Sequence, residues 1–173
     1  REKLCGYLDA LINNAGVSPK ADDGGRLNTF DTELQTWGQV FHVNFFASVV
    51  LARGLKAELV AAKGSVVNIT SIAGTRVHPF AGAAYATSKA ALAALTREMA
   101  HDFGPLGVRV NAIAPGEVET SMLSHGTDKI AEGLPLRRLG HPDEVADLIS
   151  FLCSEKSTYI SGSEIEINGG QHI

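Results

Sequence analysis

The positions of apolar residues predict an alternation of short strands and longer helices along the chain. Four segments are rich in apolar and β-branched residues, which favours buried strands: 8–13, 64–70, 108–114 and 164–167. Between them, apolar residues recur at spacings of three and four, as on the buried side of a helix. This periodicity predicts helices over residues 31–62 and 83–103, and a further helix that begins near His141.

The predicted helix over residues 31–62 is apolar on two sides. Its main stripe runs from Trp37 to Leu59, and a second stripe contains Val43, Phe46 and Val50. A helix that is apolar on two sides needs two covering surfaces. We therefore expect a sheet on one side and another helix or a second subunit on the other.

Four strands joined by helical crossovers, with no hairpin signal, predict a parallel sheet with helices on its faces. This is the α/β class, of the doubly wound, Rossmann-like type. At 173 residues, with 45% hydrophobic and 20% charged content, the chain suits one domain with a single core.

In open parallel sheets, ligands bind beyond the carboxyl ends of the strands. The unusual residues of this sequence lie there: Asn13, Asn14 and Gly16 after the first strand, Ser71 after the second, and Pro115, Gly116 and Thr120 after the third. The helix over residues 83–103 begins at the same edge. The sequence therefore predicts one convergent site.

Near its start, that helix carries Tyr85-x-x-x-Lys89. Residues at i and i+4 share one helix face, so a phenol and an ammonium lie about one turn apart. A tyrosine with a pKa of about 10 is a poor acid-base catalyst at neutral pH, and a nearby cation favours its phenolate. The same spacing also occurs on solvated helix faces, but the position of this pair at the strand edge favours general acid-base catalysis.

Taken together, these residues resemble the short-chain dehydrogenase/reductase family. Asn13-Asn14-Ala15-Gly16, Asn44, Ser71, Tyr85-x-x-x-Lys89 and Pro115-Gly116-Glu117-Val118-Glu119-Thr120 match its pattern in order, over essentially the whole chain. The match is closest to the classical type, such as 3-oxoacyl-[acyl-carrier-protein] reductases. The resemblance implies reversible hydride transfer between NAD or NADP and a small carbonyl or secondary alcohol substrate.

The resemblance also implies four catalytic residues. Tyr85 would donate and accept the proton, and Lys89 would keep the tyrosinate available and bind the nicotinamide ribose. Ser71 would hydrogen-bond the reacting oxygen, or alternatively cap a turn. Asn44 would hold a water that bridges to Lys89, or alternatively satisfy a neighbouring backbone.

For cofactor binding, the resemblance implies contacts from the loops after the strands. Asn13, Ala15 and Gly16 would pass the ribose side of the cofactor. Pro115, Gly116, Val118 and Thr120 would meet the nicotinamide, with Thr120 bonding its carboxamide. The spacing from Ser71 to Tyr85 is one residue longer than is common in the family, which we interpret as an extra residue near His78 that reshapes the substrate mouth.

The sequence departs from the family at its start, because it has no glycine-rich turn to receive the cofactor pyrophosphate on a helix N-terminus. We therefore expect residues 1–173 to form a single partial domain that lacks roughly 75 amino-terminal residues of the family pattern. The residue that selects NAD or NADP would lie in that part.

Other features narrow the function further. A net charge of −4 disfavours nucleic-acid partners, and no apolar run approaches the length of a membrane helix. The histidines show no metal-ligand spacing, so we expect no metal. A cytoplasmic protein is the default expectation, since the start has no signal-peptide hydrophobic region. The family resemblance and the two-sided helix predict a homodimer or homotetramer.

Two alternatives remain. A non-catalytic scaffold or binding module with this fold would not need Asn44, Ser71, Tyr85 and Lys89 together. A nucleotide-sugar epimerase of the extended type shares Tyr-x-x-x-Lys but would carry a larger carboxyl-terminal domain, whereas only a few residues follow Gly170.

Overall fold

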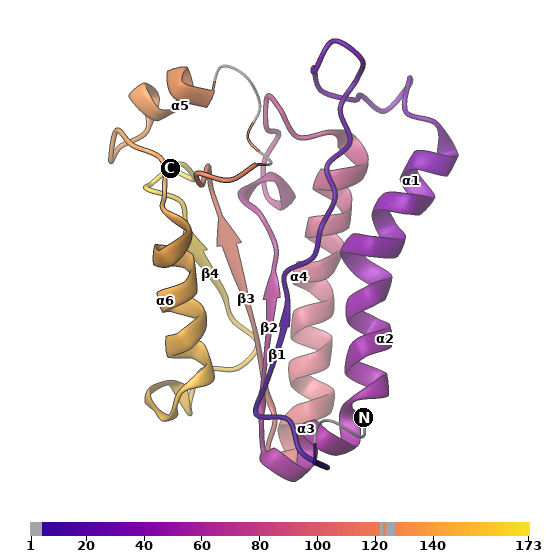
Figure 1. Cartoon of the computed structure of the whole chain (residues 1–173), viewed down its shortest axis with the longest axis vertical. Coiled ribbons are helices and arrows are strands. Elements are labelled where there is room, and N and C mark those ends of the chain that lie inside the picture. Colours follow the sequence, from indigo (N-terminus) through magenta and orange to yellow (C-terminus); the bar gives the residue numbers. More distant parts are fainter. Residues whose placement is uncertain (1–4, 122, 124–126) are drawn as a thin grey trace.

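The computed structural model describes residues 5–121, 123 and 127–173. Its centre is a four-stranded sheet (Figure 1) made of β1 (Ala10–Asn13), β2 (Ser65–Ile69), β3 (Arg109–Pro115) and β4 (Glu164–Ile167). All neighbouring strands pair in parallel, in the order β1-β2-β3-β4. The predicted parallel α/β sheet is confirmed.

Helices cover both faces of this sheet, as a doubly wound fold requires (Figure 1). They are α1 (Leu34–Phe41), α2 (Ala47–Gly54), α3 (Lys56–Ala62), α4 (Ala83–Phe103), α5 (Thr127–Gly133) and α6 (Pro142–Cys153). Helices α2, α3 and α4 contribute to the core on one face, and α6 contributes to the core on the other. The pattern of apolar residues did not predict α5.

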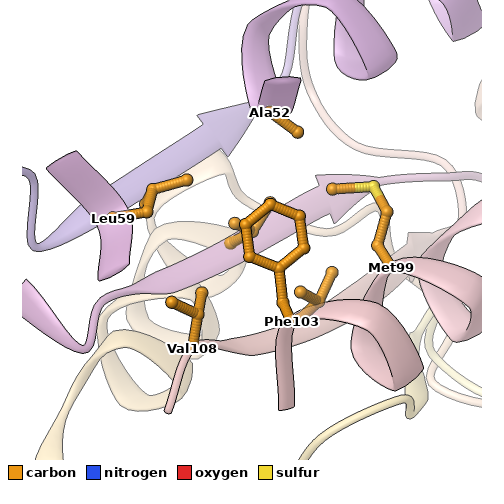
Figure 2. Packing of buried hydrophobic residues seen from close by; sticks show 7 residues of the cluster. Ala52, Leu59, Met99, Phe103 and Val108 are labelled. Atoms are coloured by element: carbon orange, nitrogen blue, oxygen red, sulfur yellow. The ribbon is translucent and has the colours of Figure 1, made fainter. Parts of the chain in front are cut away.

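The alternation of side chains along β2 divides the core in two. Val66 packs with α2, α3 and α4, where the Phe103 ring lies among Ala52, Leu59 and Met99 (Figure 2). The next residue, Val67, points to the opposite face and packs in a cluster that includes Leu152 of α6. Because β2 is apolar on both faces and fully buried, it is the central support of the site at its carboxyl end.

The predicted helix over residues 31–62 is interrupted in the structure. It begins at Leu34, and a π-helical turn, His42–Phe46, joins α1 to α2. Leu55, with φ −108° and ψ 11°, then separates α2 from α3. A π-turn inserts one residue without ending the helix, so the apolar spacing of three and four continues across it and conceals it.

The other elements lie close to their predicted positions. Helix α4 and β4 have the predicted bounds, and the other strands differ from theirs by at most two residues at either end. Helix α6 begins after His141. The ring Nδ1 of His141 accepts from the Asp143 backbone N–H (3.3 Å), and the backbone N–H of His141 donates to the Glu144 carboxylate (2.8 Å). This reciprocal pair is a capping box, with proline in the first turn as the sequence indicated.

Candidate active site

A cavity of about 770 Å³ opens at the carboxyl end of the sheet. Loops after β1, β2 and β3 line it, together with the start of α4 and part of α6. Most of the site residues expected from the sequence lie in its wall: Ala15, Gly16, Ser71, Tyr85, Lys89, Pro115, Gly116, Val118 and Thr120. Segments more than 100 residues apart in the sequence therefore meet at one site, as the topology predicted.

Tyr85 and Lys89 lie one turn apart on α4, next to the cavity. The Lys89 ammonium is 5.7 Å from the centroid of the Tyr85 ring. It is almost fully buried, and it donates a hydrogen bond to the Ile69 carbonyl at the end of β2 (2.6 Å). The end of a central strand thus fixes the position of the lysine.

Burial changes the protonation of both groups. It lowers the pKa of Lys89 to about 8, because a buried ammonium loses its hydration. It also raises the pKa of Tyr85; a hydrogen bond with Ser71 acts in the opposite direction, and the charge of Glu117 adds to the rise. The expectation that Lys89 lowers the pKa of Tyr85 is not met here, because burial dominates and Lys89 is directed at Ile69. Tyr85 is therefore held as the protonated phenol, the form that donates a proton.

Ser71 follows β2 in extended backbone and caps the short 3₁₀ turn Ile72–Gly74. Its hydroxyl oxygen accepts from the Ala73 N–H (3.1 Å), so the alternative interpretation as a cap is confirmed. A hydroxyl that accepts one bond can still donate its hydrogen, so the cap does not exclude a role toward a substrate oxygen. The turn packs tightly on α4: a Cβ at Gly74 would lie 2.9 Å from the Ala90 nitrogen. This close approach fixes Ser71 relative to the helix that carries Tyr85.

Asn44 is buried in the π-helical turn, and its polar atoms have partners. Its Oδ1 accepts from the Val17 N–H (2.8 Å), and its Nδ2 donates to the Val17 carbonyl (3.0 Å) and to the Ser88 hydroxyl (3.0 Å). The structural alternative, a bond to neighbouring backbone, is therefore observed. Asn44 ties the loop after β1 to α4, and its proposed water bridge to Lys89 stays a prediction.

Gly16 leaves space beside Lys89. A Cβ at Gly16 would lie 3.5 Å from the Lys89 Nζ and 3.5 Å from the Asn44 Oδ1, so any side chain there would enter the cavity next to the ammonium. Gly16 and Lys89 line the same cavity. A cradle bordered by backbone and one cation suits the hydroxyl-rich ribose of a nicotinamide dinucleotide, so the residues fit this cofactor.

Asn13 is directed into the core. Its Nδ2 donates to the Asn68 Oδ1 in β2 (2.8 Å), and the Asn68 Nδ2 donates to the Thr96 hydroxyl of α4 (2.9 Å). These bonds link β1, β2 and α4 beneath the cavity. The described bonds of Asn13 are thus structural, and the expected contact between Asn13 and the ribose side of the cofactor stays a prediction.

The loop after β3 approaches the loop after β4 closely at Gly116. Its N–H donates to the Ile167 carbonyl (3.1 Å), and a Cβ at this position would lie 2.7 Å from the Asn168 Cβ. Only glycine allows this approach without displacing backbone. It directs the following residues, through Val118 and Thr120, along the cavity wall.

Three further residues of the cavity wall, Lys20, His78 and Glu117, were not assigned roles from the sequence. His78 Nε2 lies 2.8 Å from Glu117 Oε1, and Lys20 donates a hydrogen bond to the Phe80 carbonyl. His78 lies where the sequence indicated an extra residue at the mouth. Glu117 lies inside the matched Pro115–Thr120 segment, and that position could have identified it as a site residue. Lys20 lies in a polar loop without periodicity, so no pattern in the sequence pointed to it.

Two classes of site are not found in the part of the chain that the structure describes. Within residues 5–121, 123 and 127–173, no group of three or more histidine, cysteine or acidic side chains is arranged to hold a metal ion. Over the same residues, no helix is both long enough and apolar enough to cross a membrane.

Known proteins resemble this chain in sequence and in structure. A family model described as enoyl-(acyl carrier protein) reductase matches residues 1–172. Protein FixR of Bradyrhizobium diazoefficiens is 59% identical over 175 residues, which cover 100% of this chain and 63% of that protein. The chain therefore spans less than two thirds of the length of this relative.

Solved structures share the fold. An oxidoreductase of the short-chain dehydrogenase/reductase family from Brucella ovis, in complex with a partially ordered NAD, is 58% identical with a TM-score of 0.81; the match covers 96% of this chain and 68% of that one. A 3-oxoacyl-[acyl-carrier protein] reductase with bound NAD from Brucella melitensis is 31% identical with a TM-score of 0.90, covering 99% and 65%. These matches confirm the resemblance drawn from the motifs: the chain belongs to the short-chain dehydrogenase/reductase family.

Proposed function

We propose that the protein is an NAD(P)-dependent oxidoreductase that interconverts a carbonyl group and a secondary alcohol. The observation that carries this proposal is the arrangement of Ser71, Tyr85 and Lys89 around one cavity, beside the space that Gly16 leaves. The related structures solved with NAD support the same cofactor class. A scaffold without activity would not need this arrangement.

The mechanism follows from the protonation states of the site. A bound nicotinamide dinucleotide supplies the hydride for reduction and takes it up in oxidation. In reduction, the Tyr85 hydroxyl gives its proton to the substrate oxygen; in oxidation, the tyrosinate removes the proton of the alcohol. Ser71 donates a hydrogen bond to the same oxygen and stabilises the negative charge that develops on it. Lys89 is fixed by Ile69. Its role in keeping the tyrosinate available stays a prediction from the family pattern, because burial sets the pKa of Tyr85 in this structure.

The residues proposed to hold the cofactor belong to the cavity wall and its support. Ala15, Gly16 and Lys89 would border the ribose, with Asn13 as a further predicted contact. Pro115, Gly116, Val118 and Thr120 would border the nicotinamide. We also propose that residues 1–173 are one part of a larger domain, in which a preceding glycine-rich turn binds the pyrophosphate and an acidic or basic residue of the same preceding part selects NAD or NADP.

The outer face of the π-turn and α2 suggests the assembly. Phe46, Val50 and Leu51 are 51%, 65% and 44% exposed. Adjacent exposed apolar side chains on one helical face indicate an interaction surface. We propose that a second copy of the chain covers them in a cytoplasmic homodimer or homotetramer. A stable monomer at micromolar concentration in light scattering of the complete gene product would contradict this.

The proposed function is tested on the complete gene product with a panel of ketones, aldehydes and secondary alcohols. NADH and NADPH absorbance reports turnover, and the better cofactor identifies the preference. Turnover of at least one carbonyl or alcohol is the expected result. Tight binding of NAD or NADP with no turnover across the panel would favour the scaffold alternative.

A further inference from the structure

Two cations of one loop hold the segment that precedes the catalytic tyrosine. Lys20 donates from its Nζ to the Phe80 carbonyl, and Arg26 donates from its Nε to the next carbonyl, that of Ala81 (2.8 Å). Lys20 and Arg26 also face one another in an isolated antiparallel bridge. The loop is therefore attached at two successive carbonyls, a few residues before Tyr85.

The two cations differ in what else they can reach. Lys20 lines the cavity together with Ser71 and Tyr85, whereas the described wall of the cavity does not include Arg26. An ammonium has three N–H donors, and the Phe80 carbonyl takes one of them. The bond to Phe80 therefore holds the Lys20 ammonium at the cavity wall with donors that remain available to a ligand.

The surroundings of Lys20 leave its charge partly uncompensated. Burial lowers its pKa, while the charge of Glu117 acts in the opposite direction. The Glu117 carboxylate is also engaged by His78 at 2.8 Å, so Lys20 shares this carboxylate. A partly buried cation gains most from a further anionic partner. An anion in the cavity would provide that partner. Lys89 is the other lysine among the described lining residues, and its ammonium donates to the Ile69 carbonyl instead.

We propose that Lys20 binds a carboxylate of the substrate, so that the preferred substrates are oxo acids and the corresponding hydroxy acids. The inference rests on the proposed oxidoreductase function, because the reacting oxygen lies at Ser71 and Tyr85 while the carboxylate lies at Lys20. A carboxylate fits better than a phosphate, since a single lysine beside Glu117 offers only one positive charge, and phosphates are usually held by several donors or by an arginine fork.

The experiment compares Lys20→Met with Arg26→Met in the complete gene product. Both changes remove a bond to the same segment, but only Lys20 faces the cavity. The substrates are 4-oxopentanoate and its methyl ester, with shorter and longer oxo acids and their esters to vary the reach. We expect the wild type to prefer acids, and Lys20→Met to raise the KM for the acid by about tenfold or more while leaving the ester unchanged. Lys20→Arg should keep the preference.

A binding measurement separates this inference from the proposed function. Calorimetry with NAD⁺ present measures the affinity of 4-oxopentanoate without turnover, and we expect Lys20→Met to weaken it while Arg26→Met does not. Lys20-dependent binding without turnover of any carbonyl would overturn the function and retain the carboxylate site. The inference is overturned if the wild type binds no acid more tightly than its ester, or if Lys20→Met and Arg26→Met affect acids and esters alike.

Discussion

The two walls of the cavity are built in different ways. On the inner wall, Lys89 is 3% exposed and is held by the Ile69 carbonyl. Asn44 supports this wall from beside Gly16; it is 1% exposed and is held by the backbone of Val17. At the mouth wall, formed by Lys20, His78 and Glu117, polar and charged side chains come from loops and contact one another or a loop carbonyl. The sheet and α4 define the first wall, and loop contacts define the second.

This difference separates chemistry from selectivity. A buried polar group that loses its partner costs about 1–3 kcal/mol, so the inner wall tolerates little change. Loops accept substitution more readily and often carry specificity. Changes to the inner wall should therefore reduce turnover or stability, whereas changes to the mouth wall should alter which substrate is used and at which pH.

The largest effect is expected for Tyr85→Phe. The variant removes the proton donor and keeps the ring, so turnover should fall by about 10²- to 10⁴-fold with little change in fold or in cofactor affinity. NAD(P)H absorbance and calorimetry measure the two quantities. Tyr159→Phe is the matched control, because Tyr159 is fully exposed and away from the cavity. Wild-type turnover in Tyr85→Phe would refute the mechanism.

Asn44→Leu should mainly affect stability. It removes the Asn44 bonds to the N–H and carbonyl of Val17 and one of the two bonds of the Ser88 hydroxyl, which should cost about 2–3 kcal/mol of the free energy of unfolding. Urea unfolding followed by circular dichroism measures this. Gln39→Leu, on an exposed position of α1, serves as the control. An unchanged midpoint for Asn44→Leu would show that the inner wall is not held together by this amide.

The inner wall could be predicted from the sequence because its residues interrupt regular patterns. Tyr85 and Lys89 have helical spacing, and Ser71 and Gly16 follow strands, so topology brings these four residues to one cavity. Asn44, which supports the wall, is marked by the apolar stripe that it breaks. The structure confirmed that meeting. What the pattern concealed was the π-turn around Asn44, since inserting one residue into a helix leaves the spacing of its apolar neighbours almost unchanged.

The mouth wall could not be predicted in the same way. Lys20 and Glu117 are nearly 100 residues apart in loops, where no period relates one residue to the next, and their proximity depends on tertiary folding. The orientation of the Asn13 side chain could not be predicted either, because it depends on a hydrogen bond to Asn68, an amide within a largely apolar strand. Loop contacts and buried amide pairs are set by the assembled fold rather than by local sequence.

Lys89→Met should change how stability depends on pH. Burial lowers the pKa of Lys89 to about 8 in the folded state, below its unfolded value, so between these values the unfolded chain binds more protons and stability rises with pH. From pH 7.5 to 9.5 the wild type should gain about 2 kcal/mol in the free energy of unfolding relative to Lys89→Met. Urea midpoints at the two pH values measure this difference. Equal gains in both proteins would mean that Lys89 does not titrate in this range.

The smallest effect is expected at the mouth wall, for Glu117→Gln. The Glu117 charge contributes to the raised pKa of Tyr85, after burial and against the Ser71 hydrogen bond. Removing that charge should therefore lower the pKa of Tyr85 and favour the tyrosinate. In the oxidation of an uncharged secondary alcohol, the rise of kcat/KM with pH should move to lower pH, because the base forms more easily.

The control for this shift is Glu119→Gln, which removes the same charge from an exposed position two residues further along the loop. Its pH profile should match that of the wild type, and both profiles contain the titration of Lys89, which therefore cancels in the comparison. A shift to higher pH in Glu117→Gln would contradict the electrostatic role. A loss of activity at every pH would mean that Glu117 itself handles the proton, and the mouth wall would then belong to the chemistry as much as the inner wall does.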